Sequence, residues 1–305
     1  IGAQGTIEDS SIVVSLHASD VDIGTNGQSL VYSATSSDSS MVVPVAVVVN
    51  DSVGTLSLTV QPDQNGSVQV TVVVDDSNGG TDSEIFTLVI SEVNDVPVAH
   101  ASSFSVLEDS VHTQQLTGVD GDTTTSLVDD QDLTYVLVDS TDHGTLILNS
   151  ATGAITYTPD GNYNGIDSLR FVVVDDGITQ GVSDPLTSTA STVSITVIPV
   201  NDAPVLTLIG AQGTIEDSSI VVSLHASDVD IGTNSQSLSY SAINYDETLV
   251  QLSTVSTGDS TSTLVFGLQP DQNGSVQVTV VVDDSTGGTD SEIFTLVISE
   301  VNDVP

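Results

Sequence analysis

Residues 65–76 read Asn-Gly-Ser-Val-Gln-Val-Thr-Val-Val-Val-Asp-Asp, and the pattern of this stretch decides the fold class. The Asn-Gly pair is a hairpin-type turn signal, and the β-branched valines that follow it favour a strand. Short runs of the same kind, each bounded by Gly, Asn, Asp or Pro, recur along the chain, for example at 12–16, 56–60 and 86–90. Helical periodicity is not sustained anywhere. The sequence therefore predicts an all-β protein.

The chain also repeats itself at an offset of 208 residues. Residues 1–26 reappear unchanged as 209–234, and residues 61–97 reappear as 269–305 with one change, Asn78 to Thr286. A divergent unit between the two copies keeps the same landmarks in the same order. About seven strands in roughly 100 residues is typical of an immunoglobulin-like sandwich. We therefore expect three tandem Greek-key β-sandwiches in an elongated array, at 1–97, 98–208 and 209–305.

The charge of the chain excludes several classes of function. Arg170 is the single basic side chain against 42 acidic ones, which gives a formal charge of −41 at pH 7. Nucleic acid is excluded as a partner because phosphate binding needs Lys and Arg. No apolar stretch reaches the ~18 residues of a membrane span, so no membrane insertion is expected. Cysteine is absent, and Ile1 as first residue is typical of an internal fragment of a longer chain.

The acidic residues gather at expected strand ends and at the Asn-Asp-x-Pro linkers 94–97, 201–204 and 302–305. Clustered carboxylates repel each other, and a hard divalent cation relieves that repulsion. Calcium binds six to eight oxygens from carboxylates, amides and backbone carbonyls, which are the groups available here. Asp20-x-Asp22-x-Gly24-x-Asn26 is not an EF-hand loop, because its twelfth position is Val31 instead of Glu.

Several motifs together resemble a known family. Ala18–Asn26, Val73–Asp76 and the linker Glu92–Pro97 look like cadherin motifs that supply calcium ligands. The middle unit is similar to the cadherin-like calcium-binding tandem repeats of large bacterial surface adhesins, including the RTX type, through its stretches 143–146, 156–160, 162–167 and 172–177. The resemblance covers all three units.

The resemblance implies calcium at the unit junctions. The implied ligands of the first junction are Glu8, Asp63, Glu92, Asp95 and the Asn94 carbonyl, with Asp120, Asp122 and Asp175. Those of the second are Glu108, Asp160, Asp202 and the Asn201 carbonyl, with Asp228, Asp230, Asn234 and Asp283. Half-sites for further units are implied at the front by Asp20, Asp22, Asn26 and Asp75, and at the back by Glu216, Asp271, Glu300, Asn302 and Asp303. Pro199 stands where Glu92 and Glu300 stand in the other units, so the two junctions need not hold equal numbers of ions.

The resulting hypothesis is a non-enzymatic, calcium-stiffened extender of a secreted, cell-surface bacterial adhesin, which holds a distal binding module in cell adhesion or biofilm formation. Its partners are calcium ions and neighbouring repeats of the same chain. Two alternatives remain: the repeats themselves adhere, homophilically or to a glycan, or they are accessory modules of a secreted hydrolase. The pair Asp75-Asp76 is not read as a glycosidase dyad, because it recurs in all three units and Trp is absent.

Overall fold

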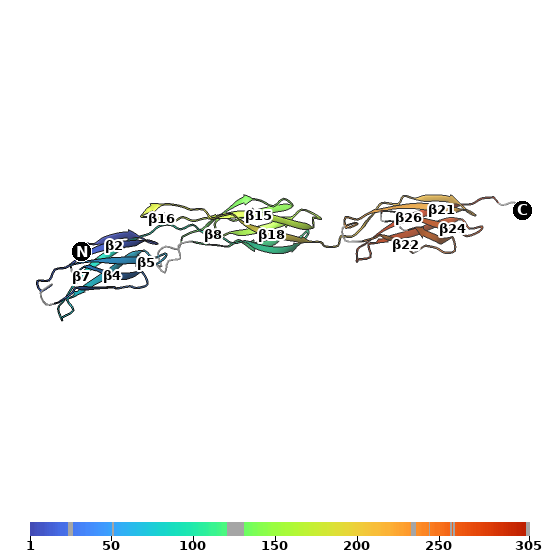
Figure 1. Cartoon of the computed structure of the whole chain (residues 1–305). Helices are drawn as coiled ribbons and strands as arrows, with labels where there is room; N and C mark the ends of the chain where they lie inside the picture. Colours follow the sequence, from blue (N-terminus) through green and yellow to red (C-terminus); the bar gives the residue numbers. More distant parts are fainter. Residues whose placement is uncertain are drawn as a thin grey trace. The chain divides into compact units, whose positions relative to one another are not determined.

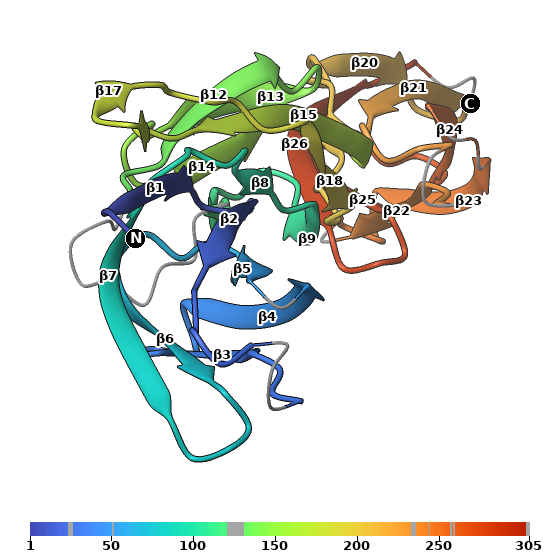
Figure 2. The ribbon, with the colours of Figure 1, turned by 60° about the vertical axis from the view of Figure 1, so that its left-hand side comes forward.

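The first β-sandwich buries every second residue of its central strands. In the computed structural model, Val68, Val70 and Val72 of one strand are buried, while Ser67 before them and Gln69 between them face solvent. The two layers have the strand orders β1-β7-β6-β3 and β2-β5-β4, and β1 runs parallel to β7 (Figure 2). The strands are β1 (Gln4–Ile7), β2 (Ser11–His17), β3 (Val31–Ser36), β4 (Val42–Asn50), β5 (Val53–Val60), β6 (Gly66–Asp75) and β7 (Thr81–Ser91).

The middle sandwich repeats this plan and adds a short hairpin. Its layers have the strand orders β12-β15-β18-β9 and β10-β14-β13, and two small ladders, β11-β8 and β16-β17, accompany them. The strands are β8 (Val98–Ala99), β9 (Ser102–Leu107), β10 (His112–Gln115), β11 (Gly118–Val119), β12 (Thr134–Asp139), β13 (Gly144–Leu148), β14 (Ala154–Pro159), β15 (Gly165–Val174), β16 (Ile178–Thr179), β17 (Val182–Ser183) and β18 (Ser191–Ile198).

The third sandwich, drawn in orange and red in Figure 1, has the strand orders β20-β26-β25-β22 and β19-β21-β24-β23. Its first strand, β19, begins directly after the linker. The strands are β19 (Val205–Leu206), β20 (Gln212–Ile215), β21 (Ser219–Ser227), β22 (Ser239–Ile243), β23 (Val250–Ser256), β24 (Thr261–Leu268), β25 (Gly274–Asp283) and β26 (Thr289–Ser299).

Each sandwich has a hydrophobic core of its own, centred on Leu56, Phe171 and Phe266 respectively. The first two cores lie in a compact unit, Ile1–Val197, and the third lies in a second unit, Ile198–Pro305. The structure describes residues 1–23, 27–50, 52–120, 131–232, 236–243, 245–256, 258 and 260–302. In those ranges the chain is all-β, as predicted, and no helix long and apolar enough to cross a membrane occurs.

One predicted turn has a different role. The Asn65-Gly66 pair does not close a hairpin, because β5 and β6 on either side of it belong to different sheets. Gly66 has φ of 121°, which a residue with a side chain rarely adopts, and the chain crosses there from one layer to the other. The Gly79-Gly80 turn does join two paired strands, β6 and β7.

The middle sandwich contains a buried carboxylate that accepts several hydrogen bonds. Asp167 is 5% exposed and accepts N–H groups of Asp142, His143 and Ser168 at 2.7–3.1 Å. It also accepts the hydroxyl of the fully buried Tyr157 at 2.9 Å. Burial raises the pKa of Asp167, but these hydrogen bonds outweigh burial, and the net pKa is lowered.

Asp167→Asn should therefore destabilise the middle sandwich at neutral pH. The amide turns a donor toward groups that need an acceptor, at a cost of about 2 kcal/mol. Because the folded pKa lies below the unfolded value of about 3.9, the carboxylate stabilises the fold above that pH, and the contribution is lost as pH falls through the folded pKa. Urea unfolding at pH 7 and pH 3 measures both effects. The gap between native chain and variant should be smaller at pH 3, and an equal gap at both would contradict the assignment.

Candidate metal centre

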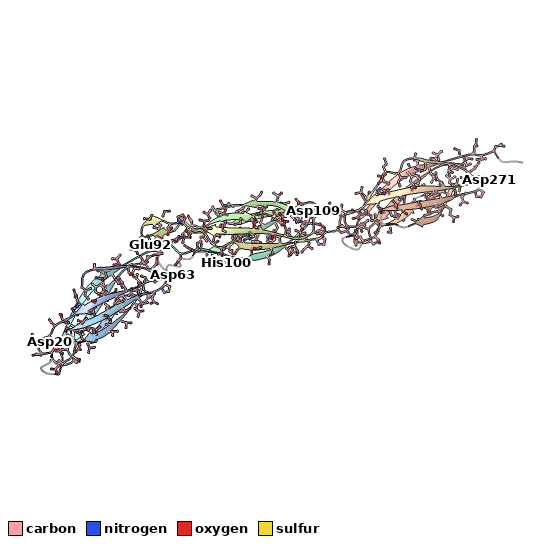
Figure 3. The ribbon with its side chains drawn as sticks, turned by 45° about the horizontal axis from the view of Figure 1, so that its top comes forward. Asp20, Asp63, Glu92, His100, Asp109 and Asp271 are labelled. Carbon is pink, nitrogen blue, oxygen red and sulfur yellow. The ribbon has the colours of Figure 1, made fainter. Side chains whose placement is uncertain are left out.

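Three aspartates meet at the back end of the first sandwich. Asp9, Asp63 and Asp95 each place a carboxylate oxygen within 4.8 Å of the other two. Asp9 and Asp63 have φ of 55° and 53°, and the N–H of Asp63 donates to Asp9 Oδ1 at 3.3 Å. Figure 3 shows Asp63 and Asp20 at opposite ends of this sandwich. Three negative charges at this separation repel each other strongly, and a bound hard cation would relieve that repulsion.

Glu8 connects the same end of the sandwich to the linker. Its side chain is 2% exposed and accepts the N–H of Val93, and its own N–H donates to the Ser91 carbonyl at 3.1 Å. Parallel pairing of β1 with β7 brings these segments together. The third sandwich has the equivalent contact, in which Glu216 accepts the N–H of Val301 at 2.6 Å.

The back end of each sandwich has the same backbone arrangement, but the middle sandwich has one carboxylate fewer there. Asn162 donates its N–H to Asp109 at 3.2 Å, and Asp271 donates to Asp217 at 3.2 Å, as Asp63 does to Asp9. The middle sandwich therefore has an amide, Asn162, at the position of Asp63. Asp160 lies two residues earlier, where its N–H donates to the His143 carbonyl at 3.0 Å.

The first linker places Asn94 inside the middle sandwich. Asn94 is 5% exposed, and its amide donates to Asp175 Oδ1 at 2.9 Å and to the Asp184 carbonyl at 2.7 Å. A Cβ at Gly177 would lie 1.9 Å from Asn94 Oδ1, so only glycine leaves room for this side chain. Asn94 Oδ1 and Asp175 Oδ2 are buried without a hydrogen-bond partner among the described residues. Amide and carboxylate oxygens are among the ligands that calcium binds.

The β16-β17 hairpin holds the same linker from the other side. The Asn94 N–H donates to Thr179 Oγ1 at 3.0 Å, and the N–H of Gln180 donates to the Glu92 carbonyl at 3.0 Å. The N–H of Gly181 donates to Glu92 Oε1 at 3.2 Å. In this structure the Glu92 side chain is therefore turned toward the hairpin.

The second linker has an equivalent contact within the third sandwich. Asn201 donates its amide to Asp284 Oδ2 at 2.8 Å and accepts the hydroxyl of Thr286 at 2.6 Å. Asp284 is fully buried. Burial raises its pKa, but the Asn201 amide and the N–H groups of Thr286 and Gly288 outweigh burial and hold the net pKa well below the usual range.

The Asp-x-Asp motif of the third sandwich faces this linker. The N–H of Asp202 donates to Asp230 Oδ2 at 2.7 Å, and the N–H of Asp230 donates to Asp228 Oδ1 at 2.8 Å. Asp228 Oδ2 is buried with no hydrogen-bond partner in the described part of the chain. The first sandwich repeats the local turn, in which Asp22 donates to Asp20 at 2.8 Å.

Residues 2–89 and 201–297 match the family described as Bacterial Ig domain, and together these stretches cover more than half of the chain. The chain belongs to the bacterial Ig domain family. Residues 94–199, which include the middle sandwich, match the family described as Bacterial cadherin-like domain. The expected cadherin-like character is thus found by sequence in the middle unit, whereas the two nearly identical outer units are bacterial Ig domains.

Solved structures with the same fold include multidomain cadherin ectodomains. A structure of mouse cadherin-23 EC22-24 is 20% identical, with a TM-score of 0.54 and coverage of 99% of this chain and 97% of that one. Protocadherin gamma B7 EC3-6 is 17% identical, with a TM-score of 0.56 and coverage of 94% and 77%. At this identity the likeness shows the fold alone. The chain spans 45% and 59% of two further protocadherin ectodomains that it matches, gamma B4 and gamma B2. No curated protein matches it.

In the two bacterial Ig domains, the predicted ligands Asp75 and Asp283 are not the counterparts of the predicted ligand Asp175 in the middle sandwich. Tyr32, Tyr135 and Tyr240 pair with Val74, Val173 and Val282 across the sheet. Counted from these valines, Asp76, Asp175 and Asp284 are equivalent, so Asp75 and Asp283 lie one position earlier. Asp283 accepts the N–H of Ser285 at 2.6 Å, and Asp75 that of Ser77 at 2.6 Å.

Other predicted ligands have less defined places. Asp120 is half-buried after β11, and Glu300 and Asn302 are exposed beyond β26. Asn26, Asp122, Asn234 and Asp303 lie outside the described residues. The sequence analysis did not assign Asp9, Asp76, Asp184 or Asp284 as individual ligands. The Glu-Asp pair that recurs at Glu8, Glu108 and Glu216 is the signal that could have indicated Asp9.

Gly177→Ala should expel Asn94 from its site and lower the thermal midpoint of the chain. Loss of the amide contacts to Asp175 and Asp184 costs about 1–3 kcal/mol. Gly161→Ala is the matched control in the same sandwich, because a Cβ there meets nothing within 4 Å. Calorimetry without added metal measures the difference. Equal midpoints for the two variants would show that Asn94 does not secure the linker.

Proposed function

We propose that this chain is a calcium-stiffened extender segment of a secreted bacterial cell-surface adhesin. The observation that carries the proposal is the cluster of Asp9, Asp63 and Asp95 at the end of a sandwich. Next to it, Asn94 of the linker and Asp175 of the middle sandwich each have a buried oxygen with unfilled acceptor capacity. Calcium would supply the positive charge that lets these carboxylates approach each other. Similarity to the bacterial Ig and bacterial cadherin-like families supports an extracellular, adhesion-related, non-enzymatic role.

The three carboxylates of the cluster come from both sides of the first joint between sandwiches. Asp9 and Asp63 belong to the first sandwich, and Asp95 belongs to the linker that Asn94 fixes into the middle sandwich. A cation shared by the three carboxylates would therefore connect the end of one sandwich to the start of the next. Repulsion among the same groups would bend the joint when the cation is removed.

The hairpin gives the first joint a second fastening that needs no metal. Glu92 receives two N–H groups from residues 180 and 181, whereas Pro199 at the equivalent place in the second linker has no carboxylate to offer. We infer that the second joint is the softer of the two, with or without calcium.

A specific observation favours one alternative, adhesion by the first repeat itself. Strand β4 is an edge strand, and Val43, Val45 and Val47 on it are 41–53% exposed. It lies within residues 27–60, the interval in which the first unit departs from the third. The test is aggregation of beads coated with the chain. Aggregation with the native chain that is lost with the Val45→Asp variant would favour this alternative over the extender.

Calcium should raise the melting temperature of the native chain far more than magnesium, which demands a tighter octahedron. One site at a hundredfold excess over its Kd adds about 2.7 kcal/mol to the free energy of unfolding. Asp63→Asn should bind fewer calcium ions in titration calorimetry, whereas Asp38→Asn, on an exposed turn, should bind as many as the native chain. Identical melting in chelator and in millimolar calcium would refute the calcium proposal.

Small-angle scattering of the full chain should show a larger maximum dimension and lower flexibility in calcium than in chelator, because the joints straighten when their carboxylates are neutralised. Asp38→Asn should behave like the native chain in both conditions. A dimension and flexibility that do not respond to calcium would contradict the extender mechanism, even if calcium binds.

A further inference from the structure

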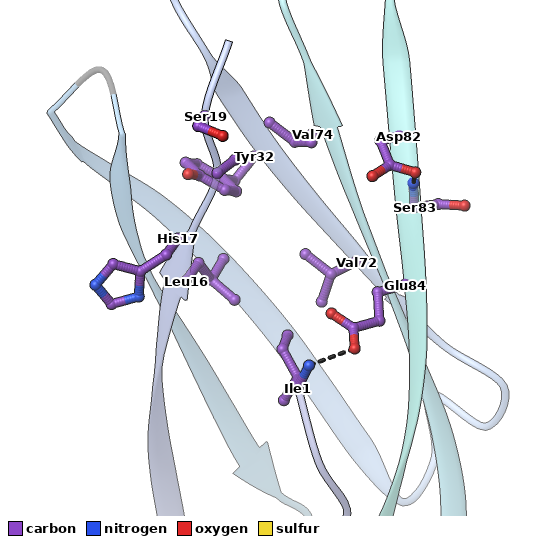
Figure 4. A pocket seen from close by; sticks show the side chains of 11 residues that line it. Ile1, Leu16, His17, Ser19, Tyr32, Val72, Val74, Asp82, Ser83 and Glu84 are labelled. Atoms are coloured by element: carbon purple, nitrogen blue, oxygen red, sulfur yellow. Dashed lines mark hydrogen bonds and ion pairs between the residues drawn. The ribbon is translucent and has the colours of Figure 1, made fainter.

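The first sandwich has an open groove between its two sheets (Figure 4). Its cavity of about 340 Å³ is lined by Leu16 and Ala18 near β2, by Tyr32 of β3, and by Val72 and Val74 of β6. Asp82 stands at the rim and uses Oδ1 to accept the N–H of Ser83 at 2.9 Å. The groove thus has apolar side chains between the sheets, and polar side chains, among them the carboxylates of Asp82 and Glu84, also line it.

The third sandwich contains the same groove, built from identical residues at an offset of 208, and there a strand occupies it. Strand β19 pairs with β21, and Leu206 lies 4% exposed in the core. The N–H of Leu206 donates to Asp290 Oδ2 at 2.7 Å, and the N–H of Thr207 donates to the His225 carbonyl at 2.8 Å. Asp290 and His225 are the counterparts of Asp82 and His17.

Burial of the identical residues shows what the strand contributes. Ala226, Val280 and Val282 are 0% exposed in the third sandwich. Their counterparts are more accessible, since Ala18 and Val74 are only half-buried and Val72 is 7% exposed. The strand next to the groove also differs, because β21 continues to Ser227 whereas β2 ends at His17.

A second hollow of about 240 Å³ adjoins the groove and shares Ala18, Val74 and Asp82 with it. It contains Asp76 and Gly80, whose counterparts in the third sandwich touch the linker. Asp284 accepts the Asn201 amide, and a Cβ on Gly288 would lie 2.8 Å from the Cα of Ala203. The two hollows together therefore match the path of residues 201–206.

We propose that this groove docks an extended linker strand of the pattern Asn-Asp-x-Pro-Val-Leu joined ahead of Ile1. The asparagine binds Asp76, the leucine fills the space between the sheets, and the leucine N–H donates to Asp82. The middle sandwich supports the rule, because β8 follows its linker in the same way and buries Ala99 to 6% exposure. The docking needs no metal. The Ile1 ammonium pairs with the exposed Glu84 at the mouth of the groove, and its conversion to an amide has little effect because such a surface pair is weak.

Cysteine accessibility tests the proposal, since the chain has no cysteine of its own. Ala18→Cys reports on the groove of the first sandwich, and Ala226→Cys is the matched control in the filled copy. In chelator, Ala18→Cys should react with a thiol reagent on the order of tenfold faster than Ala226→Cys. Placing the sequence of residues 201–208 ahead of Ile1 should slow Ala18→Cys to the rate of Ala226→Cys. It should also raise the melting midpoint of the first sandwich by roughly 10 °C.

The added segment carries its own control, in which the leucine equivalent to Leu206 is replaced by Asp. This variant should leave Ala18→Cys as reactive as in the native chain. Equal rates for Ala18→Cys and Ala226→Cys without the added segment, or no protection by it, would overturn the proposal. Protection that instead grows with the concentration of the native chain would assign the groove to a second copy and would also overturn it. Since all measurements are made in chelator, a failure here is distinct from a failure of the calcium proposal.

Discussion

Asn94 and Asn201, the asparagines of the first two linkers, are each held by a buried carboxylate of the sandwich that follows, and the organisation of the chain depends on this contact. Asn94 binds Asp175, and Asn201 binds Asp284, both through the side-chain amide at 2.8–2.9 Å. Asn94 is buried and must find partners, because an unpaired amide in the interior costs several kcal/mol. The linker is therefore part of the next sandwich, and the acidic residue that follows each asparagine is delivered at a defined position.

The sequence was sufficient for the fold because two independent signals agreed. Alternating valines such as Val68, Val70 and Val72 bury one face of a strand, and the 208-residue repeat required any solution for the first unit to serve the third. The hairpin assignment of Asn65-Gly66 was wrong, because a turn signal shows that the chain reverses but does not show which sheet the next strand joins.

The candidate site was less predictable because it depends on register. In a run such as Asp75-Asp76, a shift of one residue exchanges the two faces of a strand, and only the pairing of Tyr32 with Val74 shows that Asp76 is the counterpart of Asp284. Asn162, not Asp160, is the counterpart of Asp63, because both lie two residues before the asparagine of an Asn-Gly pair. The contacts of Thr179 and Asp184 with the linker have no local signal in the sequence, because they join segments about 85 residues apart.

The carboxylates of the chain differ in the groups that surround them. Arg170 pairs with Asp139 on the surface, so it cannot also neutralise the buried acids. Asp167 and Asp284 are instead satisfied by N–H, amide and hydroxyl donors of their own sandwich, which stabilise a negative charge without any counterion. Asp9, Asp63 and Asp95 instead bring three carboxylate oxygens within 4.8 Å of one another at the end of a sandwich. Internal donors thus serve the carboxylates inside a sandwich. Under the proposed function an ion from solution would serve the cluster at its end, so that the joint, but not the sandwich, would respond to calcium.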